Sequence, residues 1–291
     1  MQRARTEHTE KAWAAIMMAP AVLVLAAVAL YPTLASIWLS FHRLILVFHE
    51  QRFVGFENYA FLVKDARFFG ALGHTAYFTV LSVTAELVLG LGLALFLQAG
   101  PPARTLLRAA ILVPWAIPTV VSARMWAWFF TQQGDGLLAA LGARDIAWLG
   151  TPGYAMHAAI LVDVWKTTPF VALLLLTGLV GIPPAIYDAA AIDGASRLRT
   201  LFRITLPLVR PVFVVTALLR ALDAFRVFDV VYVLTEGGPA NTTETLSVYA
   251  YKTMMRAGDF GYGSALSVMT FICVLFLAAG YFAWARWEEN R

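Results

Sequence analysis

Long apolar runs separated by short polar segments dominate the chain. An apolar run of about 20 residues is enough to cross a hydrocarbon core of about 30 Å. Six such runs predict membrane-spanning helices at residues 13–40, 73–97, 108–130, 155–180, 208–234 and 263–285. We therefore expect an all-α, polytopic membrane protein that forms a single transmembrane domain over residues 1–291.

The composition agrees with this pattern. The 291 residues are 60% hydrophobic and 14% charged, whereas soluble domains carry about 25% charged residues. The first apolar run follows Arg3, Arg5 and Lys11, as in a signal peptide, but its length and the five later runs favour a retained first helix. The single cysteine, Cys273, lies inside an apolar run and excludes an intramolecular disulfide.

Positive charge near the span ends predicts the orientation, because cytoplasmic segments are enriched in Lys and Arg. Six spans place both termini on one side. With the termini inside, the inner segments hold eleven such residues: Arg3, Arg5, Lys11, Arg104, Arg108, Arg197, Arg199, Arg203, Arg210, Arg286 and Arg291. The outer segments hold seven: Arg43, Arg52, Lys64, Arg67, Arg144, Lys252 and Arg256. We therefore expect both termini in the cytoplasm.

A polar segment, DAAAIDGASRLRTLF at residues 188–202, interrupts the apolar runs. Pro183 and Pro184 end one helix and can begin another, so a short helix is expected at about 187–199. Its alanines have little bulk and would let a partner's surface come close to the backbone, while Gly194 permits a turn. A second, basic helix with Arg197, Arg199 and Arg203 is expected after that turn, up to Pro207. By its pattern alone, the segment is more typical of an ordinary solvated loop on the cytoplasmic side.

Eight ionisable residues fall inside the expected spans: Glu86, Arg124, Asp163, Lys166, Arg220, Asp223, Arg226 and Asp229. Each would cost about 2.5–3.5 kcal/mol at a lipid-facing helix centre, so we expect them to face the protein interior or a wet cavity. On the fourth and fifth spans they recur every three residues with alternating sign, which allows ion pairs within a helix. A rise of about 1.5 Å per residue places Asp163, Lys166, Arg220 and Asp223 near the middle of the membrane.

Two interpretations of these charges stay open on the residues alone. The ion pairs could join neighbouring helices, or they could line a cargo site near the midplane. A sugar would suit such a site, because its hydroxyls accept and donate charge-assisted hydrogen bonds and its ring faces pack on aromatic side chains. Nearby aromatic candidates are Trp165, Phe170 and Phe225, with Trp126 and Trp128 as weaker ones. Glu86 is expected to have a pairing role.

Several catalytic motifs are absent from the sequence. It has no G-x-x-x-x-G-K-[ST] phosphate-binding loop, so this chain is not expected to hydrolyse ATP. Neither H-E-x-x-H nor G-x-S-x-G occurs and the five histidines are scattered, so we expect no metal site and no hydrolase centre. Gly90 and Gly92 are expected to permit close helix packing rather than to bind a ligand.

The polar segment resembles the EAA loop of ABC importer permeases, which forms a coupling helix that sits in a groove on the ATP-binding subunit. The match consists of DAAAIDGA at 188–195 followed by Phe202, Ile204, Leu206 and Pro207, with Asp188 where Glu is usual. The stretches FVGFENYAFLVKDARFFGALGHT, DVWKTTPF and VLTEGGP resemble other segments of carbohydrate permeases. WKTTPF and LDAFRVFD are similar to the MalF-type subunits of trehalose and maltose importers.

This resemblance implies a type I ABC importer permease fold and the transport of a disaccharide, trehalose or maltose, across the bacterial cytoplasmic membrane. It implies a sugar pocket lined by Asp163, Lys166, Thr167, Phe170, Arg220, Asp223, Ala224 and Val227. It also implies a coupling surface made by Tyr187, Asp188, Ala189, Ala190, Asp193, Gly194 and Ala195.

The resemblance further implies the partners of the chain. They are a second homologous permease subunit, two ATP-binding subunits that hold ATP and Mg, and an extracytoplasmic solute-binding protein. No cofactor is expected in this chain and no nucleic acid is expected as a partner. Two alternatives stay open: an ABC permease for another cargo, such as glycerol 3-phosphate or an oligosaccharide, and an ion-coupled secondary carrier.

Overall fold

The computed structural model describes residues 13, 17–100, 104–131 and 146–289. Predictions about Arg3, Arg5, Lys11, Arg144 and Arg291 therefore lie outside the described residues. Within the described part, five helices are long and apolar enough to cross a membrane: Met17–Ser40, Ala66–Gln98, Pro152–Val180, Arg197–Phe225 and Phe260–Trp284. Five of the six expected spans thus coincide with long apolar helices, with ends that differ by several residues.

The chain divides into two compact units, which we describe separately. One consists of Met1–Lys64 and Ala250–Met269, the other of Asp65–Tyr249 and Thr270–Arg291. Two helices cross from one unit to the other, α14 (Leu246–Tyr251) and α15 (Phe260–Glu289).

The first unit contains the only sheet in the described part of the chain. A π-helical turn, η1 (Ala26–Leu30), leads into α2 (Tyr31–Ser40), and strands β1 (His42–Ile45) and β2 (Glu50–Phe53) then form an antiparallel hairpin around the 3-10 turn η2 (Leu46–Phe48). The π-turn η4 (Lys252–Arg256) also belongs here. The helix α3 (Glu57–Leu62) holds the hairpin's base, because the Asn58 amide donates to the carbonyls of Ser40 (2.8 Å) and His42 (3.0 Å).

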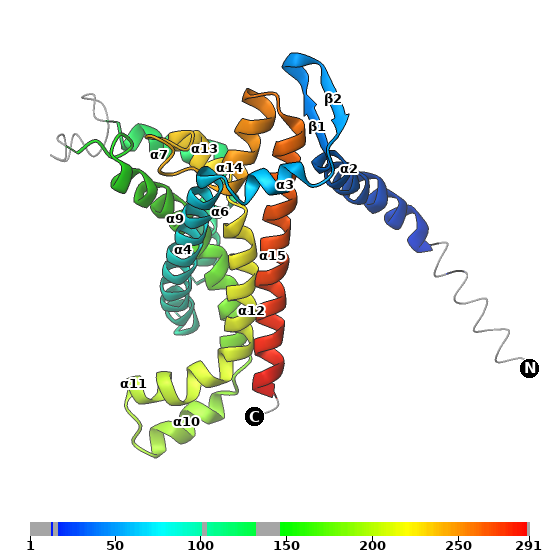
Figure 1. Cartoon of the computed structure of the whole chain (residues 1–291). Coiled ribbons are helices and arrows are strands. Elements are labelled where there is room, and N and C mark those ends of the chain that lie inside the picture. Colours follow the sequence, from blue (N-terminus) through cyan, green and yellow to red (C-terminus); the bar gives the residue numbers. More distant parts are fainter. Residues whose placement is uncertain (1–12, 14–16, 101–103, 132–145, 290–291) are drawn as a thin grey trace, which may run out of the picture. The chain divides into compact units, whose positions relative to one another are not determined.

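Three long helices of the second unit lie side by side (Figure 1): α4 (Ala66–Gln98), α9 (Pro152–Val180) and α12 (Leu206–Phe225). The helix α4 begins where the Asp65 carboxylate accepts a hydrogen bond from the amide of Arg67 (2.9 Å), a typical N-cap. The helix α9 begins with Pro152 in its first turn, where the missing amide costs no hydrogen bond.

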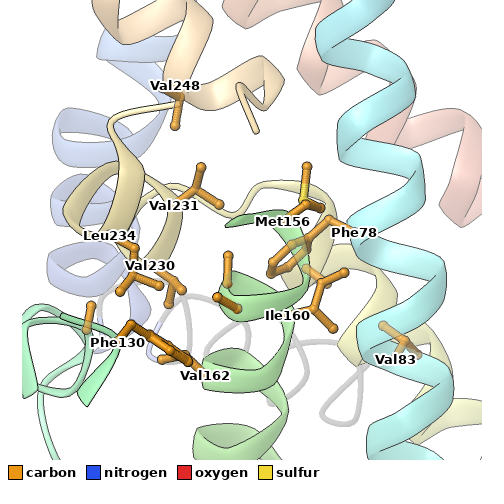
Figure 2. Close-up of a cluster of buried hydrophobic side chains, with 14 residues drawn as sticks. Phe78, Val83, Phe130, Met156, Ile160, Val162, Val230, Val231, Leu234 and Val248 are labelled. Carbon is orange, nitrogen blue, oxygen red and sulfur yellow. The ribbon is translucent and has the colours of Figure 1, made fainter. Parts of the chain in front are cut away.

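Two buried apolar clusters hold this unit together. One joins α9 to α4 and to the short helices α7 (Thr119–Phe129) and α13 (Asp229–Thr235), as Figure 2 shows for Phe78, Phe130, Ile160 and Val230 among others. The other lies further along α4 and α9 and includes Ala94, Leu175, Leu179 and Val209. The cavity described below lies between these clusters on α9, because Asp163 to Phe170 separate their members along that helix.

The expected third span, 108–130, is not one helix. It consists of α5 (Arg104–Ile111), α6 (Val113–Ala116) and α7, with extended backbone at Ile117 (ψ 134°) and Pro118 (ψ 138°) between α6 and α7. Pro118 lacks the amide that would continue the helical ladder, and a proline disfavours helical backbone at the residue before it. Hydropathy alone therefore overestimated the length of this helix.

The expected fifth span, 208–234, is also shorter at its end. Helix α12 ends at Phe225, residues 226–228 are not helical, and α13 begins at Asp229. At its start the helical segment extends back through the π-turn η3 (Leu201–Thr205) to α11 (Arg197–Thr200). Arg226 and Asp229 therefore do not continue the helical row of Arg220 and Asp223, which corrects the sequence-based expectation.

The polar segment between the fourth and fifth spans forms two helices separated by a turn, as the sequence predicted, and the first of them ends before residue 199. Helix α10 runs over Pro184–Ile192, and α11 follows after a turn. Gly194 occupies that turn with φ of +70°, a left-handed conformation that glycine adopts without strain, as predicted. Ser196 then caps α11 by accepting a hydrogen bond from the amide of Arg199.

The two glycines of α4 differ in their surroundings. A Cβ added at Gly90 would lie 2.6 Å from Cγ1 of Val171 on α9, so Gly90 permits the close packing that the sequence predicted. A Cβ at Gly92 would meet nothing within 4 Å, so that part of the prediction is wrong.

Candidate functional site

A buried carboxylate and a buried guanidinium form the centre of a polar network. Glu86 on α4 is fully buried and Arg220 on α12 is 4% exposed. Arg220 donates to Glu86 from Nε (2.6 Å) and Nη2 (3.0 Å), a bidentate geometry that fixes both groups. Thr167 on α9 donates to the same carboxylate at 2.6 Å. The expected pairing role of Glu86 is thus found, with Arg220 as its partner.

Two further carboxylates share the guanidinium of Arg220. Its Nη1 donates to Asp223 at 2.6 Å, and its Nη2 to Asp163 on α9 at 3.4 Å. Asp223 is also reached by Arg226 at 3.3 Å. The network therefore ties three helices, α4, α9 and α12, around one cation. Each additional carboxylate offsets part of the cost of burying the guanidinium.

Lys166 differs from its expected role. The sequence spacing predicted an ion pair with Asp163, but the structure places Asp163 against Arg220. The Lys166 ammonium instead donates to two backbone carbonyls at the break between α6 and α7, those of Trp115 (3.1 Å) and Ile117 (2.8 Å). Those carbonyls lie at a helix end, where no intrahelical donor reaches them.

A cavity of about 550 Å³ lies beside this network, between α9, α12 and the broken third span. This volume falls within the range of about 300–1,000 Å³ typical of small-molecule sites. All eight residues that the sequence assigned to a sugar pocket line it: Asp163, Lys166, Thr167, Phe170, Arg220, Asp223, Ala224 and Val227. Sequence reasoning missed seven other lining residues: Trp115, Thr119, Leu219, Phe228, Val230, Arg226 and Asp229, the last two having been assigned only to the row of charges.

The aromatic candidates divide into those that line the cavity and those that do not. Phe170 lines it and stacks on Trp115, with ring centroids 5.3 Å apart and planes 8° apart. Trp165 faces a second, apolar cavity, and Phe225 is buried. Trp126 and Trp128 do not line the first cavity. The signal in the sequence that could have indicated Trp115 is its position between two prolines, Pro114 directly before it and Pro118 three residues after it.

Of the eight ionisable residues expected to face inward, Arg124 is the exception. It is exposed on α7 and takes no part in the network. Asp223, Arg226 and Asp229 are also exposed, but they line the cavity. Within the described residues, no group of His, Cys, Asp and Glu is arranged to hold a metal ion.

The residues assigned to coupling lie on α10 and the turn after it. Asp188, Ala189, Asp193 and Gly194 are exposed, whereas Ala195 is half-buried. Three large apolar side chains beside them are also exposed: Ile192 (86%), Leu198 (69%) and Phe202 (64%).

Two coupling residues point inward. Ala190 is buried, so it does not offer the close approach predicted for it. Tyr187 is half-buried, and its hydroxyl receives hydrogen bonds from Gln98 at the end of α4 (3.4 Å) and from Thr205 before α12 (3.5 Å). Tyr187 therefore connects α10 to two spanning helices.

At the opposite end of α4, a second ion pair was not anticipated. Arg67 donates to the buried Glu244 from Nε (2.7 Å) and Nη2 (2.9 Å), and its guanidinium lies 4.4 Å from the ring centre of Tyr249. The Tyr249 hydroxyl in turn donates to Asp65 at 2.6 Å. These contacts attach the segment after α13 to the start of α4.

The fold and the site together define a class of protein. The family model described as "Binding-protein-dependent transport system inner membrane component" matches residues 86–291. The chain belongs to this family and is a multi-pass inner-membrane permease, not an enzyme. This membership confirms the expected class of the chain as a permease subunit of a binding-protein-dependent importer.

Identity to particular relatives shows that the chain is a permease subunit of the MalF type. The chain is 41% identical to "Trehalose/maltose transport system permease protein MalF" of Thermococcus litoralis, over 94% of each chain. It is 36% identical to "Sulfoquinovosyl glycerol transport system permease protein SmoG" of Agrobacterium fabrum, over 92% of this chain and 88% of that protein.

The comparison with solved structures concerns the fold. A chain of a bacterial ABC transporter involved in the import of the acidic polysaccharide alginate aligns with a TM-score of 0.81. The alignment covers 97% of this chain and 99% of that chain at 21% identity, so it shows the type I importer permease fold and nothing about cargo.

Proposed function

We propose that this chain is a permease subunit of an ATP-driven ABC importer that moves a disaccharide, trehalose or maltose, across the bacterial cytoplasmic membrane. The observation that carries the proposal is the 550 Å³ cavity beside the network of Glu86 and Arg220. The 41% identity to a trehalose/maltose permease supports this choice of cargo.

The charges of the cavity favour a neutral, hydroxyl-rich cargo. Three carboxylates and three cations line it: Asp163, Asp223, Asp229, Lys166, Arg220 and Arg226. Glu86, buried behind Arg220, adds a further negative charge. A phosphate group would thus meet a guanidinium that is already paired, beside like charges that repel it. Sugar hydroxyls can instead accept from the cations and donate to the carboxylates.

The same arrangement supports a scheme for energy supply. We place the exposed face of α10 and α11 in the cytoplasm, with both termini, against one of two ATP-binding subunits that hold ATP and Mg. A second permease subunit would complete the pathway and a solute-binding protein would deliver the sugar from outside. Because Tyr187 links α10 to α4 and α12, movement of the docked helix would reach the helices that carry the cavity.

Uptake by the assembled transporter in proteoliposomes tests this proposal. The complete complex with its solute-binding protein should accumulate labelled trehalose or maltose only when ATP is present on the cytoplasmic side. Glycerol 3-phosphate and sulfoquinovosyl glycerol serve as anionic controls that should not be accumulated.

Two results would contradict the proposal. Accumulation of an anionic or longer cargo, with no disaccharide uptake, would assign the chain to another ABC importer. Uptake by the purified chain alone, driven by an ion gradient and indifferent to ATP, would establish a secondary carrier.

A further inference from the structure

The break between α6 and α7 brings an unpaired helix end beside the cavity. Helix α6 ends at Ala116, and the amides of Ala116 and Ile117 still bond back to Leu112 and Val113. The backbone is extended at Ile117 and Pro118, so the helical ladder does not continue to the carbonyls of Trp115 and Ile117. In a membrane, each unsatisfied carbonyl is costly, so this break needs a donor from another element.

Lys166 supplies that donor from α9. Lys166 is 8% exposed, and its ammonium donates to the carbonyls of Trp115, inside α6, and of Ile117, at the end of α6. An ammonium has three donor hydrogens, so two of the three are used in holding backbone. Asp163, three residues before Lys166 on α9, pairs with Arg220 rather than with Lys166.

The side chain of Trp115 is held by the same face of α9. Phe170 follows Lys166 by four residues, a spacing that places the two side chains above one another on a helix. Its ring lies parallel to the Trp115 indole at 5.3 Å. One face of α9 thus fixes Trp115 twice, at its carbonyl through Lys166 and at its ring through Phe170.

Trp115 is nevertheless accessible from the cavity. It lines the cavity and is 46% exposed, although it is a large apolar side chain beside a polar network. A sugar ring has one face of C–H groups, which packs on an indole while its hydroxyls meet polar partners. The charged groups of α9 and α12 provide such partners across the same cavity.

We propose that the indole of Trp115 is a cargo-stacking platform of this cavity, and that Lys166 is a positioning residue that holds it there across the broken span. This inference rests on the proposed function, because it assigns parts of the same sugar site. Lys166 then acts on the cargo through Trp115 rather than as a direct ligand.

Transport per ATP in the reconstituted complex tests the platform. Trp115→Ala should lower the number of sugars imported per ATP hydrolysed by about three- to tenfold, the value of one aromatic stacking contact, while Trp115→Phe should retain most of it. The matched control is Trp128→Ala, an exposed tryptophan of the same broken span that does not line the cavity, which should behave as wild type. Equal loss in both alanine variants would overturn the proposal.

The role of Lys166 is tested by non-additivity. Lys166→Met should reproduce the loss of Trp115→Ala, and the double variant should lose no more than either single one. Lys166→Gln, which keeps a donor for the carbonyls without the charge, should retain part of the transport and covers the case in which Lys166→Met does not fold. If Lys166→Met reduces transport equally with and without Trp115, Lys166 acts independently and the inference is wrong.

A labelling experiment separates failure of this inference from failure of the proposed function. In the assembled complex with Cys273→Ser, which removes the single cysteine, Trp115→Cys should react with a small water-soluble thiol reagent, and trehalose should slow that reaction. Val121→Cys, exposed on α7 but not lining the cavity, should react more slowly and without protection. If the wild-type complex imports no disaccharide, the proposed function fails; unreactive Trp115→Cys overturns the placement of Trp115 in either case.

Discussion

At the scale of single residues, Arg220 organises the polar centre of the molecule. Its guanidinium meets Glu86, Asp163 and Asp223, which come from three helices. Glu86 is the only one of these carboxylates that is fully buried, and the only one that accepts two hydrogen bonds from Arg220. Its removal should therefore affect stability more than any exposed ion pair of the chain.

Glu86→Gln should lower the free energy of unfolding by about 3–5 kcal/mol, because it leaves a buried cation without its main partner. Glu50→Gln is the matched control, since Glu50 pairs with Arg43 and Arg52 on the exposed hairpin. That change should cost about 0–1 kcal/mol. Unfolding of the detergent-solubilised protein by denaturant measures both, and equal stability of the two variants would contradict a structural role for the network.

The sequence predicted the ion pair of Arg220 and Asp223 within one helix, which the structure contains, but not the ion pairs between helices. The free-energy cost of placing an ionisable side chain in the membrane depends on that residue alone. Glu86, Asp163, Arg220 and Asp223 could therefore each be identified from the sequence as charges inside a span. Their pairing depends on which helices are neighbours, and the spacing of Asp163 and Lys166 pointed to the wrong partner. Lys166 donates to backbone carbonyls at a helix break about fifty residues earlier in the chain, and no pattern along its own helix predicts that contact.

At the scale of the helices, the pattern of apolar runs predicted the five long spans. It did not predict the break at Ile117 or the end of α12 at Phe225. Hydropathy averages over a window, and the residues around both breaks are apolar enough to hide them. Pro114 and Pro118 were the local signal for the first break, whereas the second lies at Arg226, whose side chain reaches back to Asp223.

The packing of α4 on α9 gives a prediction at this scale. Gly90→Ala should destabilise the protein by about 1–3 kcal/mol, because the added methyl overlaps Val171. Gly92 is exposed and lies on a different face of α4 from Gly90. Gly92→Ala should therefore be neutral or should stabilise the protein by up to about 1 kcal/mol through helix propensity. Adding Val171→Ala to Gly90→Ala should restore part of the loss. Thermal unfolding in detergent measures the series, and a harmless Gly90→Ala would refute the close approach of these helices.

At the scale of the whole molecule, two features must act together for import. The cavity lies on α9 and α12, and the exposed helix α10 lies between the same two helices in the chain. Tyr187 connects α10 to Gln98 of α4 and to Thr205 before α12. Family membership and fold were accessible from the sequence because short motifs carry them, whereas this link required the folded chain.

The central claim is that α10 transmits work from ATP-binding subunits to the cavity, and Gly194 offers its most direct test. Its φ of +70° and open surroundings mean that tryptophan would distort the turn and add bulk to the docking face without a clash inside the chain. Asparagine tolerates the same backbone conformation and is the matched control.

The decisive measurement is the number of sugars imported per ATP hydrolysed by the reconstituted complex with Gly194→Trp or Gly194→Asn. The account predicts that the tryptophan variant remains in the membrane and supports ATP hydrolysis but loses about fivefold or more of its uptake, while the asparagine variant stays close to wild type. Normal uptake per ATP by Gly194→Trp would contradict the account.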